Sequence, residues 1–287
     1  MLHEVRVARW ALFSGVVATS ACSLFVDTGG FSSGGTNPAD SAGTDALDAS
    51  ATSDASSDVA SEAAIDGGLP KYVSAVLADQ PLLYYRFEQT EGPSVRDEMN
   101  TWPGSADLFV KFNAPGAMPG SLAIALDGKG SINAGSVGDF TGNQNFTVEC
   151  WVKPNVSDDK FRHPMNKDLD VGGPRESYGL FLYLGRIAFE RYVNGSGVQA
   201  STDSLPIDVW YHVAGTYDGT QLVLYVNGVQ AKVAPDARSA KAKPVPFYVG
   251  TKDPTYGNIS GAIDEVALYD KALGPERVRA HFDAAKP

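Results

Sequence analysis

Apolar and polar side chains alternate along several short stretches of the chain from residue 81 onward. In the stretch 146–154, every second residue is apolar, and these residues are Phe146, Val148, Cys150 and Val152. Trp151 falls on the opposite side. A period of two is typical of a β-strand with one face in the core. Similar runs predict further strands, which lie within residues 81–88, 121–135, 178–195, 210–233, 247–251 and 261–270.

Turn-forming dipeptides separate these runs. Asp218-Gly219 and Asn227-Gly228 each lie between two alternating stretches. Both dipeptides tolerate positive φ, so they predict two-residue hairpin turns, and another hairpin should reverse near Gly185. Many short strands joined by tight turns predict an all-β fold, a two-sheet antiparallel β-sandwich or jelly roll.

Helical periodicity is limited to short segments. Residues 275–286 begin with Pro275, which suits a first helical turn, and place Val278 and Phe282 on one face, so they predict a short C-terminal helix. Residues 72–77 allow one or two helical turns. The charged stretch 157–177 has no strand alternation, and we expect it to be a loop.

The first 22 residues have the pattern of an export signal. An apolar run follows Arg6 and Arg9 and ends at Cys22, and it is too short to span the ~30 Å core of a bilayer. The small residues directly before Cys22 resemble the lipobox of bacterial lipoproteins, although Thr19 stands where that motif usually has Leu. We therefore predict a lipoprotein signal peptide over residues 1–22, with Cys22 as the lipid attachment site. The alternative is a plain signal peptide with an incidental cysteine.

Charge is distributed unevenly along the chain. The formal net charge is -11, and residues 23–70 contribute eight acidic and no basic side chains. This Ser-, Ala- and Asp-rich segment predicts a disordered linker, because it lacks the apolar residues needed for a core. Residues 71–287 carry 25 acidic and 21 basic side chains and form the predicted domain. No basic stripe is present, so nucleic acid is not an expected partner. Two cysteines are too few for a disulfide scaffold or a four-cysteine zinc site.

Six sequence blocks within residues 72–286 resemble the laminin-G-like, concanavalin A-like jelly-roll domains. The blocks are VLADQPLLYYRFEQTEG, ALDGKGSI, FTVECWVKP, WYHVAGTYDGTQLVLYVNGV, FYVGT and GAIDEVALYDKAL. The resemblance implies two curved sheets packed face to face, with loops around the rim of the concave side. Domains of this fold bind glycans, bind proteins or act as spacers, and some are glycosidases, so the fold alone does not determine function.

The same resemblance implies a structural calcium ion. Relatives hold it with an acid near the first strand and an acid on the strand that matches IDEV, and the corresponding positions here are Glu88 and Asp264. Asp127 is a third candidate ligand. The alternative is that Asp264 caps buried backbone groups and Asp127 only forms a turn.

Glycosidase chemistry is not expected. It needs two carboxyl groups facing each other across the scissile bond, and the catalytic glucanases of this fold place three acids at alternate positions of one strand. No such triplet occurs in this sequence. Asp264 and Glu265 are adjacent and should point to opposite faces of a strand, Glu149 has no acidic neighbour on its strand, and His212 is expected to be structural. We therefore predict that the protein is not an enzyme.

Aromatic side chains in or beside predicted loops are candidates for stacking on sugar rings. They are Trp102, Tyr192 and Tyr256, together with Trp151, which lies opposite the apolar face of its strand. Each could instead pack in the core or under a loop. In the charged stretch, Asp158, Asp159, Asp168 and Asp170 could hold a calcium ion at the rim, with solvated loop charge as the alternative, and Asp168 and Asp170 are also candidate ligand-binding residues. We therefore predict a monomeric module that binds glycans or a cell-surface protein. It should be secreted and held by its lipid anchor in the cell envelope, in the outer membrane or on the cell surface. A spacer or protein-binding domain without a small ligand is the alternative, followed by a glycoside hydrolase.

Overall fold

The structure of the protein is a computed structural model, which describes residues 69–168, 174–251 and 257–287. The chain divides into two units, Met1–Glu62 and Ala63–Pro287, and all the described residues belong to the second unit. The predicted signal peptide with Cys22, most of the predicted linker, Asp170 and Tyr256 lie outside the described residues. Neither helix in the described part is long and apolar enough to cross a bilayer.

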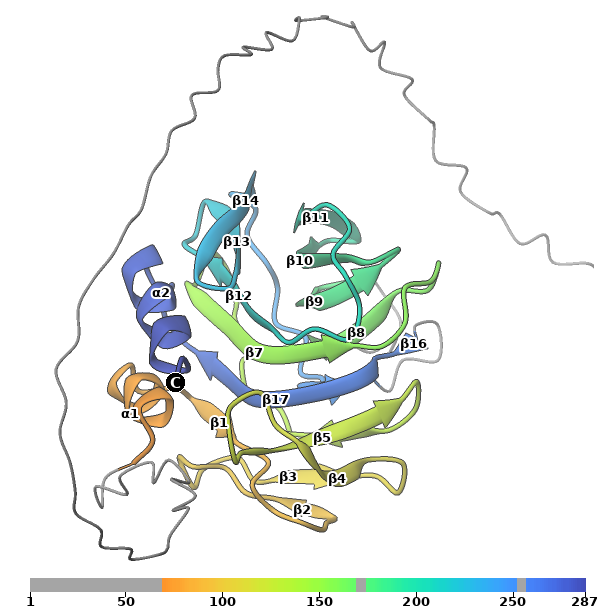
Figure 1. Ribbon diagram of the computed structural model, residues 1–287. Coiled ribbons are helices and arrows are strands. Elements are labelled where there is room, and N and C mark those ends of the chain that lie inside the picture. Colours follow the sequence, from red (N-terminus) through yellow and green to blue (C-terminus); the bar gives the residue numbers. More distant parts are fainter. Residues whose placement is uncertain (1–68, 169–173, 252–256) are drawn as a thin grey trace, which may run out of the picture. The chain divides into compact units, whose positions relative to one another are not determined.

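The described residues form two sheets that pack face to face, with two short helices (Figure 1). The strands of the first sheet are β1 (Leu83–Tyr85), β4 (Lys111–Pro115), β5 (Leu122–Asp127), β7 (Phe146–Pro154), β12 (Tyr211–Tyr217), β13 (Gln221–Val226), β14 (Val229–Pro235) and β17 (Ser260–Tyr269). This eight-stranded sheet has the order β14-β13-β12-β7-β17-β5-β4, and β1 pairs with β17.

The second sheet has nine strands in the described residues. They are β2 (Ser94–Val95), β3 (Gly104–Ala106), β6 (Ser131–Asn133), β8 (Arg162–Lys167), β9 (Ser177–Tyr183), β10 (Arg186–Val193), β11 (Ser196–Ser201), β15 (Tyr248–Gly250) and β16 (Gly257–Asn258). Their order is β11-β10-β9-β8-β15-β6-β3-β2, and all of these pairings are antiparallel; β16 adds a parallel pairing with β8. The predicted all-β, two-sheet antiparallel sandwich is confirmed.

Two apolar clusters hold these layers together. The larger cluster lies between the sheets and includes Cys150 and Phe189, both fully buried. The second lies between the outer face of the eight-stranded sheet and the helices α1 (Lys71–Ala78) and α2 (Pro275–Ala284). Pro275 stands in the first turn of α2, as its fixed φ predicts. Both helices therefore cover the same sheet (Figure 1).

The turns confirm one dipeptide prediction and correct another. Asn227 and Gly228, with φ of 51° and 72°, form a two-residue connection between β13 and β14. The other hairpin has three residues between β12 and β13, because the Asp218 carboxylate accepts hydrogen bonds from the backbone N–H groups of Thr220 and Gln221 and widens the turn. The two-residue turn predicted at Asp218-Gly219 was therefore wrong.

The charged stretch 157–177 is not a continuous loop, because strand β8 runs through it. Only Met165 contributes an apolar side chain to the core, and the pairing of β8 with β9 shifts register between Arg162 and Met165. This irregularity and the proline at position 164 remove the alternation that sequence analysis depends on. The strand nevertheless lies inside the sheet, between β9 and β15.

Candidate functional site

The face of the nine-stranded sheet that points away from the core carries the candidate site. On β9, Leu180 and Leu182 belong to the core, so the alternating side chains of Phe181 and Tyr183 point to the other face. The two described helices lie on the opposite sheet (Figure 1). Side chains on this face of the nine-stranded sheet are therefore positioned by rigid strands without a helix over them.

A pair of stacked aromatic rings lies at one end of this face. The rings of Phe161 and Tyr183 are nearly parallel, at 16°, with centroids 4.6 Å apart, and Phe181 packs 5.4 Å from Phe161. Phe161 is 44% exposed. Its carbonyl accepts a hydrogen bond from the N–H of Gly257 at 2.9 Å, which fixes the backbone just before β8. The pair is a preformed aromatic platform, in which Phe161 is partly open to solvent and Tyr183 is half-buried.

An ionic row continues across the same face from the aromatic platform. His163 lies 3.7 Å from Glu190, and Glu190 lies 3.2 Å from the guanidinium of Arg175, which also contacts Asp168 at 2.5 Å. The guanidinium of Arg175 stacks 3.7 Å above the ring of Tyr192. Burial, together with the nearby charge of Glu190, raises the pKa of Tyr192 above its usual range.

Two carboxylates in the ionic row lie close together because both pair with the same guanidinium, that of Arg175. Asp168 and Glu190 both contact the Nη2 atom of Arg175. A glycosidase needs one carboxylic acid and one carboxylate separated by the scissile bond. Here the guanidinium lies between the two groups and pairs with both of them. The arrangement favours a structural support for Tyr192, and the absence of catalysis stays a prediction.

The four aromatic candidates from the sequence have different surroundings. The ring of Tyr192 lies between the guanidinium of Arg175 and the backbone of Gly197. Gly197 is so close that a Cβ atom added to it would lie 2.7 Å from the ring. Both faces of the Tyr192 ring are therefore covered. Trp102 is half-buried against the main core, and Trp151 is 7% exposed and stacks on Phe282 beneath α2. Tyr256 is not described. The structure brings Tyr192 and Asp168 together in the ionic row and places the two tryptophans elsewhere.

The open platform was missed by sequence analysis. Phe161 lies in the stretch that was interpreted as a charged loop, and Tyr183 lies at the end of a predicted strand. The available signal was an isolated aromatic residue among charged neighbours in the segment from Asp158 to Arg162. The two ion-pair contacts between Asp158 and Arg162, at 2.8 and 2.6 Å, brace the segment that presents Phe161.

The three calcium candidates do not lie together. The fully buried Asp264 accepts hydrogen bonds from the N–H of Ala117 at 2.9 Å and the hydroxyl of Ser121 at 3.3 Å. Glu88 accepts from the N–H of Leu122 at 3.3 Å, so it lies near Asp264. Asp127 is exposed, and its backbone pairs with Ser260, four residues along β17 from Asp264 and roughly 13 Å away.

Arg86 supplies a positive charge to this acidic cluster. Its guanidinium contacts Glu88 at 3.1 Å and Glu265 at 3.4 Å. One carboxylate oxygen of Asp264 has no hydrogen-bond partner, which would suit a cation, but calcium requires six to eight oxygen ligands. In the described part of the chain, no three acidic, His or Cys side chains are grouped so that they could hold a metal ion. Calcium at Glu88 and Asp264 stays a prediction.

A β-bulge changes the expected directions of Asp264 and Glu265. The register of β17 against β7 shifts between Asp264 and Ala267, and Glu265 has a φ of 51°. As a result both carboxyl groups are buried on the helix side of the sheet, where Glu265 accepts a hydrogen bond from Tyr84. The prediction of opposite faces was wrong. Burial raises the pKa of both groups, and for Glu265 the charge of Asp264 adds to this effect.

Glu149 is the centre of a buried network that the sequence did not indicate. Its carboxylate contacts His212 at 2.6 Å and His281 at 2.9 Å, and it accepts a hydrogen bond from Tyr269 at 2.8 Å. Burial alone would raise the pKa of Glu149, but the two imidazoles hold it well below its usual range. All four side chains are fully buried between the sheet and the helices, so the network fastens these layers together.

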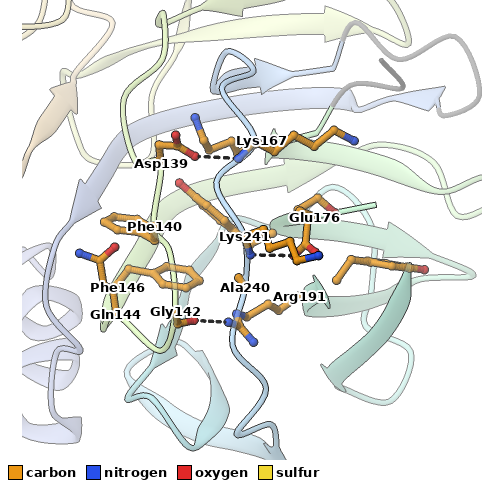
Figure 2. A pocket seen from close by; sticks show the side chains of 14 residues that line it. Asp139, Phe140, Gly142, Gln144, Phe146, Lys167, Glu176, Arg191, Ala240 and Lys241 are labelled. Atoms are coloured by element: carbon orange, nitrogen blue, oxygen red, sulfur yellow. Dashed lines mark hydrogen bonds between the residues drawn. The ribbon is translucent and has the colours of Figure 1, made fainter. Parts of the chain in front are cut away.

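A narrow pocket opens between the two sheets, at the end of β9 opposite the platform (Figure 2). Its lining includes the buried side chains of Tyr178, Phe146 and Glu176 and the exposed Lys241. Its room for solvent is about 20 Å³, which holds one water-sized group and no sugar ring. This pocket is therefore not the site for a whole sugar.

Comparison with known proteins identifies the family. The family model Laminin_G_3, described as the concanavalin A-like lectin/glucanases superfamily, matches residues 126–279. The chain belongs to this family. The resemblance found in the sequence is confirmed, and the Laminin_G_3 match includes both Phe161 and Tyr183. Among curated proteins, none matches the chain in sequence.

Solved structures share the fold at low sequence identity. Domain 4 of AbnA, a GH43 extracellular arabinanase from Geobacillus stearothermophilus, in complex with arabinotriose, is 21% identical with a TM-score of 0.57, over 71% of this chain and 97% of that chain. The binding domain of Paraclostridial Mosquitocidal Protein 1 is 17% identical with a TM-score of 0.58, over 72% of this chain and 53% of that one.

A sialidase from Trypanosoma rangeli, in complex with the inhibitor DANA, also contains this fold. It is 17% identical with a TM-score of 0.52, and the match covers 70% of this chain and 32% of the sialidase. At such identities these similarities show the fold of the Laminin_G_3 domain and not its ligand.

Proposed function

We propose that this Laminin_G_3 domain is a non-catalytic binding module that takes a carbohydrate at the Phe161–Tyr183 platform. The supporting observation is the stacked pair of rings, of which Phe161 is 44% exposed, on the face of the nine-stranded sheet that points away from the core. Aromatic side chains with a few fixed polar groups are typical of ligand sites, and sugar rings present apolar C–H faces that suit such a platform. The similar arabinanase domain, solved with arabinotriose, supports this choice of ligand class.

The platform can be tested with one substitution and a matched control. We expect Phe161→Ala to weaken retention on polysaccharides by about tenfold or more, the cost of removing an aromatic anchor from a binding site. Phe109→Ala is the control, because Phe109 is 55% exposed on another loop. Affinity electrophoresis on a panel that includes arabinan, with a glycan array for breadth, provides the measurement. Equal retention of Phe161→Ala and wild type on the ligands bound would contradict the proposal.

A protein partner is the second candidate, and an apolar rim beside the platform favours it. Leu184, Ile207 and Val209 are each between 40% and 49% exposed. Leu184 follows Tyr183 directly, and the loop with Ile207 is joined to the same turn by the hydrogen bond from Leu205 N–H to Gly185 O. Exposed apolar groups that gather in this way are typical of protein interfaces. No retention on any glycan would shift the proposal to such a partner.

The cellular location is proposed from the sequence alone. We infer a lipid anchor on Cys22 and a long acidic tether, which together would display the domain at the cell envelope. A flexible tether of this length extends roughly 35 to 40 Å, so the platform could reach ligands beyond the membrane surface.

A further inference from the structure

The pocket between the sheets is crossed by a lysine-bearing segment. In Figure 2 the segment with Ala240 and Lys241 passes between the loop with Asp139 and the strand with Arg191. Lys243 follows on the same segment and also lines the pocket. Three lysines, including Lys167 at the end of β8, therefore belong to the lining of one small pocket.

Lys167 is an unusual residue in a protein interior. It is 3% exposed, and its Nζ atom donates hydrogen bonds only to neutral backbone carbonyls, those of Val137 at 3.1 Å and Val245 at 2.7 Å. No carboxylate in the described residues forms an ion pair with it. Lysine is almost never buried without a partner charge, and an ammonium group has three donors, of which two are used here. The third donor has no acceptor among the described residues.

The carboxylates near the pocket are occupied by backbone groups. Glu176 accepts hydrogen bonds from the N–H groups of Asn194 at 2.9 Å and Lys241 at 3.3 Å, and Asp139 accepts from the N–H of Lys243 at 3.2 Å. Within the described part of the chain, the amines of Lys241 and Lys243 have no ion pair. The lining thus has three lysines against two carboxylates, which keep their charge, so the lysines exceed these carboxylates by one.

Arg191, the fourth cation of the lining, shares its counter-ion Asp236 with Arg238. Its guanidinium forms a 2.9 Å ion pair with Asp236. Burial lowers the pKa of the Lys167 amine to about 8, although the negative charge of Asp139 acts to raise it. The amine is therefore still largely protonated at neutral pH. An anion in the pocket would stabilise that protonated form, since the two charges attract in a poorly solvated site.

We propose that this pocket is an anion site that takes one oxygen of a carboxylate group, such as that of an acidic sugar, with Lys167 as the buried donor and Lys241 and Lys243 at the mouth. The room of about 20 Å³ fits a single oxygen, and the rest of the ligand would remain outside. The site is separate from the platform, because β9 runs from Ser177 to Tyr183 between them, a span of roughly 20 Å. It does not depend on the proposed function.

Calorimetric titration at constant ionic strength tests the anion site. Sodium glucuronate and sodium acetate are the probes, and glucose is the neutral control. We expect the carboxylates to bind the wild-type domain and Lys167→Met to weaken them by about tenfold or more, because a charge-assisted hydrogen bond is lost. Lys232→Met, on the exposed strand β14, should bind like wild type. Affinity should also fall as the pH rises above about 8.

Each outcome bears on the proposal. Binding of both carboxylates identifies a simple carboxylate site, and binding of glucuronate alone identifies a site for acidic sugars. The double variant Lys241→Met, Lys243→Met changes only residues outside the core and should weaken binding as well, so the test does not rest on a core substitution. Unchanged affinity in Lys167→Met, equal binding of glucose, or no binding of either carboxylate would overturn the anion site and leave the Phe161–Tyr183 platform unaffected.

Discussion

His281 joins two carboxylates that belong to different layers of the domain. Its Nδ1 atom lies 2.9 Å from Glu149, and its Nε2 atom lies 2.9 Å from Asp79 and 3.1 Å from the carbonyl of Ala75. A carbonyl can only accept, so Nε2 carries a proton, and a second proton on Nδ1 satisfies the carboxylate. Burial alone would lower the pKa of His281, but the charges of Glu149 and Asp79 outweigh it and raise the pKa.

This raised pKa predicts a stability that depends on pH. The stabilisation by His281 should be fully present below about pH 6.5, the unfolded value, and be lost as the pH rises through the higher folded value. Urea unfolding of His281→Gln should therefore show a loss of about 3 kcal/mol or more at pH 6, as expected for a broken buried pair, and a smaller loss at pH 9. Arg279→Gln, which removes an exposed ion pair with Asp283, is the control. An equal loss at both pH values would contradict the charged histidine.

At the level of elements, the hairpin of β13 and β14 is packed directly against α2. Gly228 and Gly120 both have a positive φ, of 72° and 80°. A Cβ on Gly228 would lie 2.9 Å from the Cβ of Phe282, whereas a Cβ on Gly120 meets nothing within 4 Å. We expect Gly120→Ala to cost about 1–2 kcal/mol for the left-handed backbone alone. Gly228→Ala should cost more because it also displaces α2, and equal losses in urea unfolding would show that the hairpin and helix are not tightly packed.

The elements also show where sequence patterns stop being informative. Strands with one apolar face, such as β7 and β12, follow from the period of two. Strand β8 could not be predicted in this way, because its irregular pairing hides the alternation. The bulge at Glu265 turns its carboxyl group to the same face as Asp264, whereas strict alternation would place it on the opposite face. The site follows the same logic. Tyr192 was a reasonable platform by position, but its coverage by Arg175 comes from a residue seventeen positions earlier in the chain, which no local pattern reveals.

At the level of the whole molecule, the predicted anchor and the domain can be tested together. We expect mass spectrometry of the mature protein to find Cys22 as an acylated N-terminus, because the small residues before it resemble a lipobox. Cys22→Ser should release the protein from the membrane fraction, and Cys150→Ala, a change in the buried core, should not. An unmodified N-terminus beyond residue 22 would remove the lipoprotein hypothesis and leave the binding platform unchanged.

The first and last elements of the described domain depend on each other. β1 pairs with β17, and Asp79, at the end of α1, binds Arg277 of α2, 198 residues later in the chain. A helix of eight residues is too short to persist without such contacts. While a ribosome is still making this chain, α1 and β1 therefore lack α2 and β17, and loop closure over that distance slows the final docking. The layer formed by α1, α2 and β17 is therefore completed only after the last residues of the chain have been made.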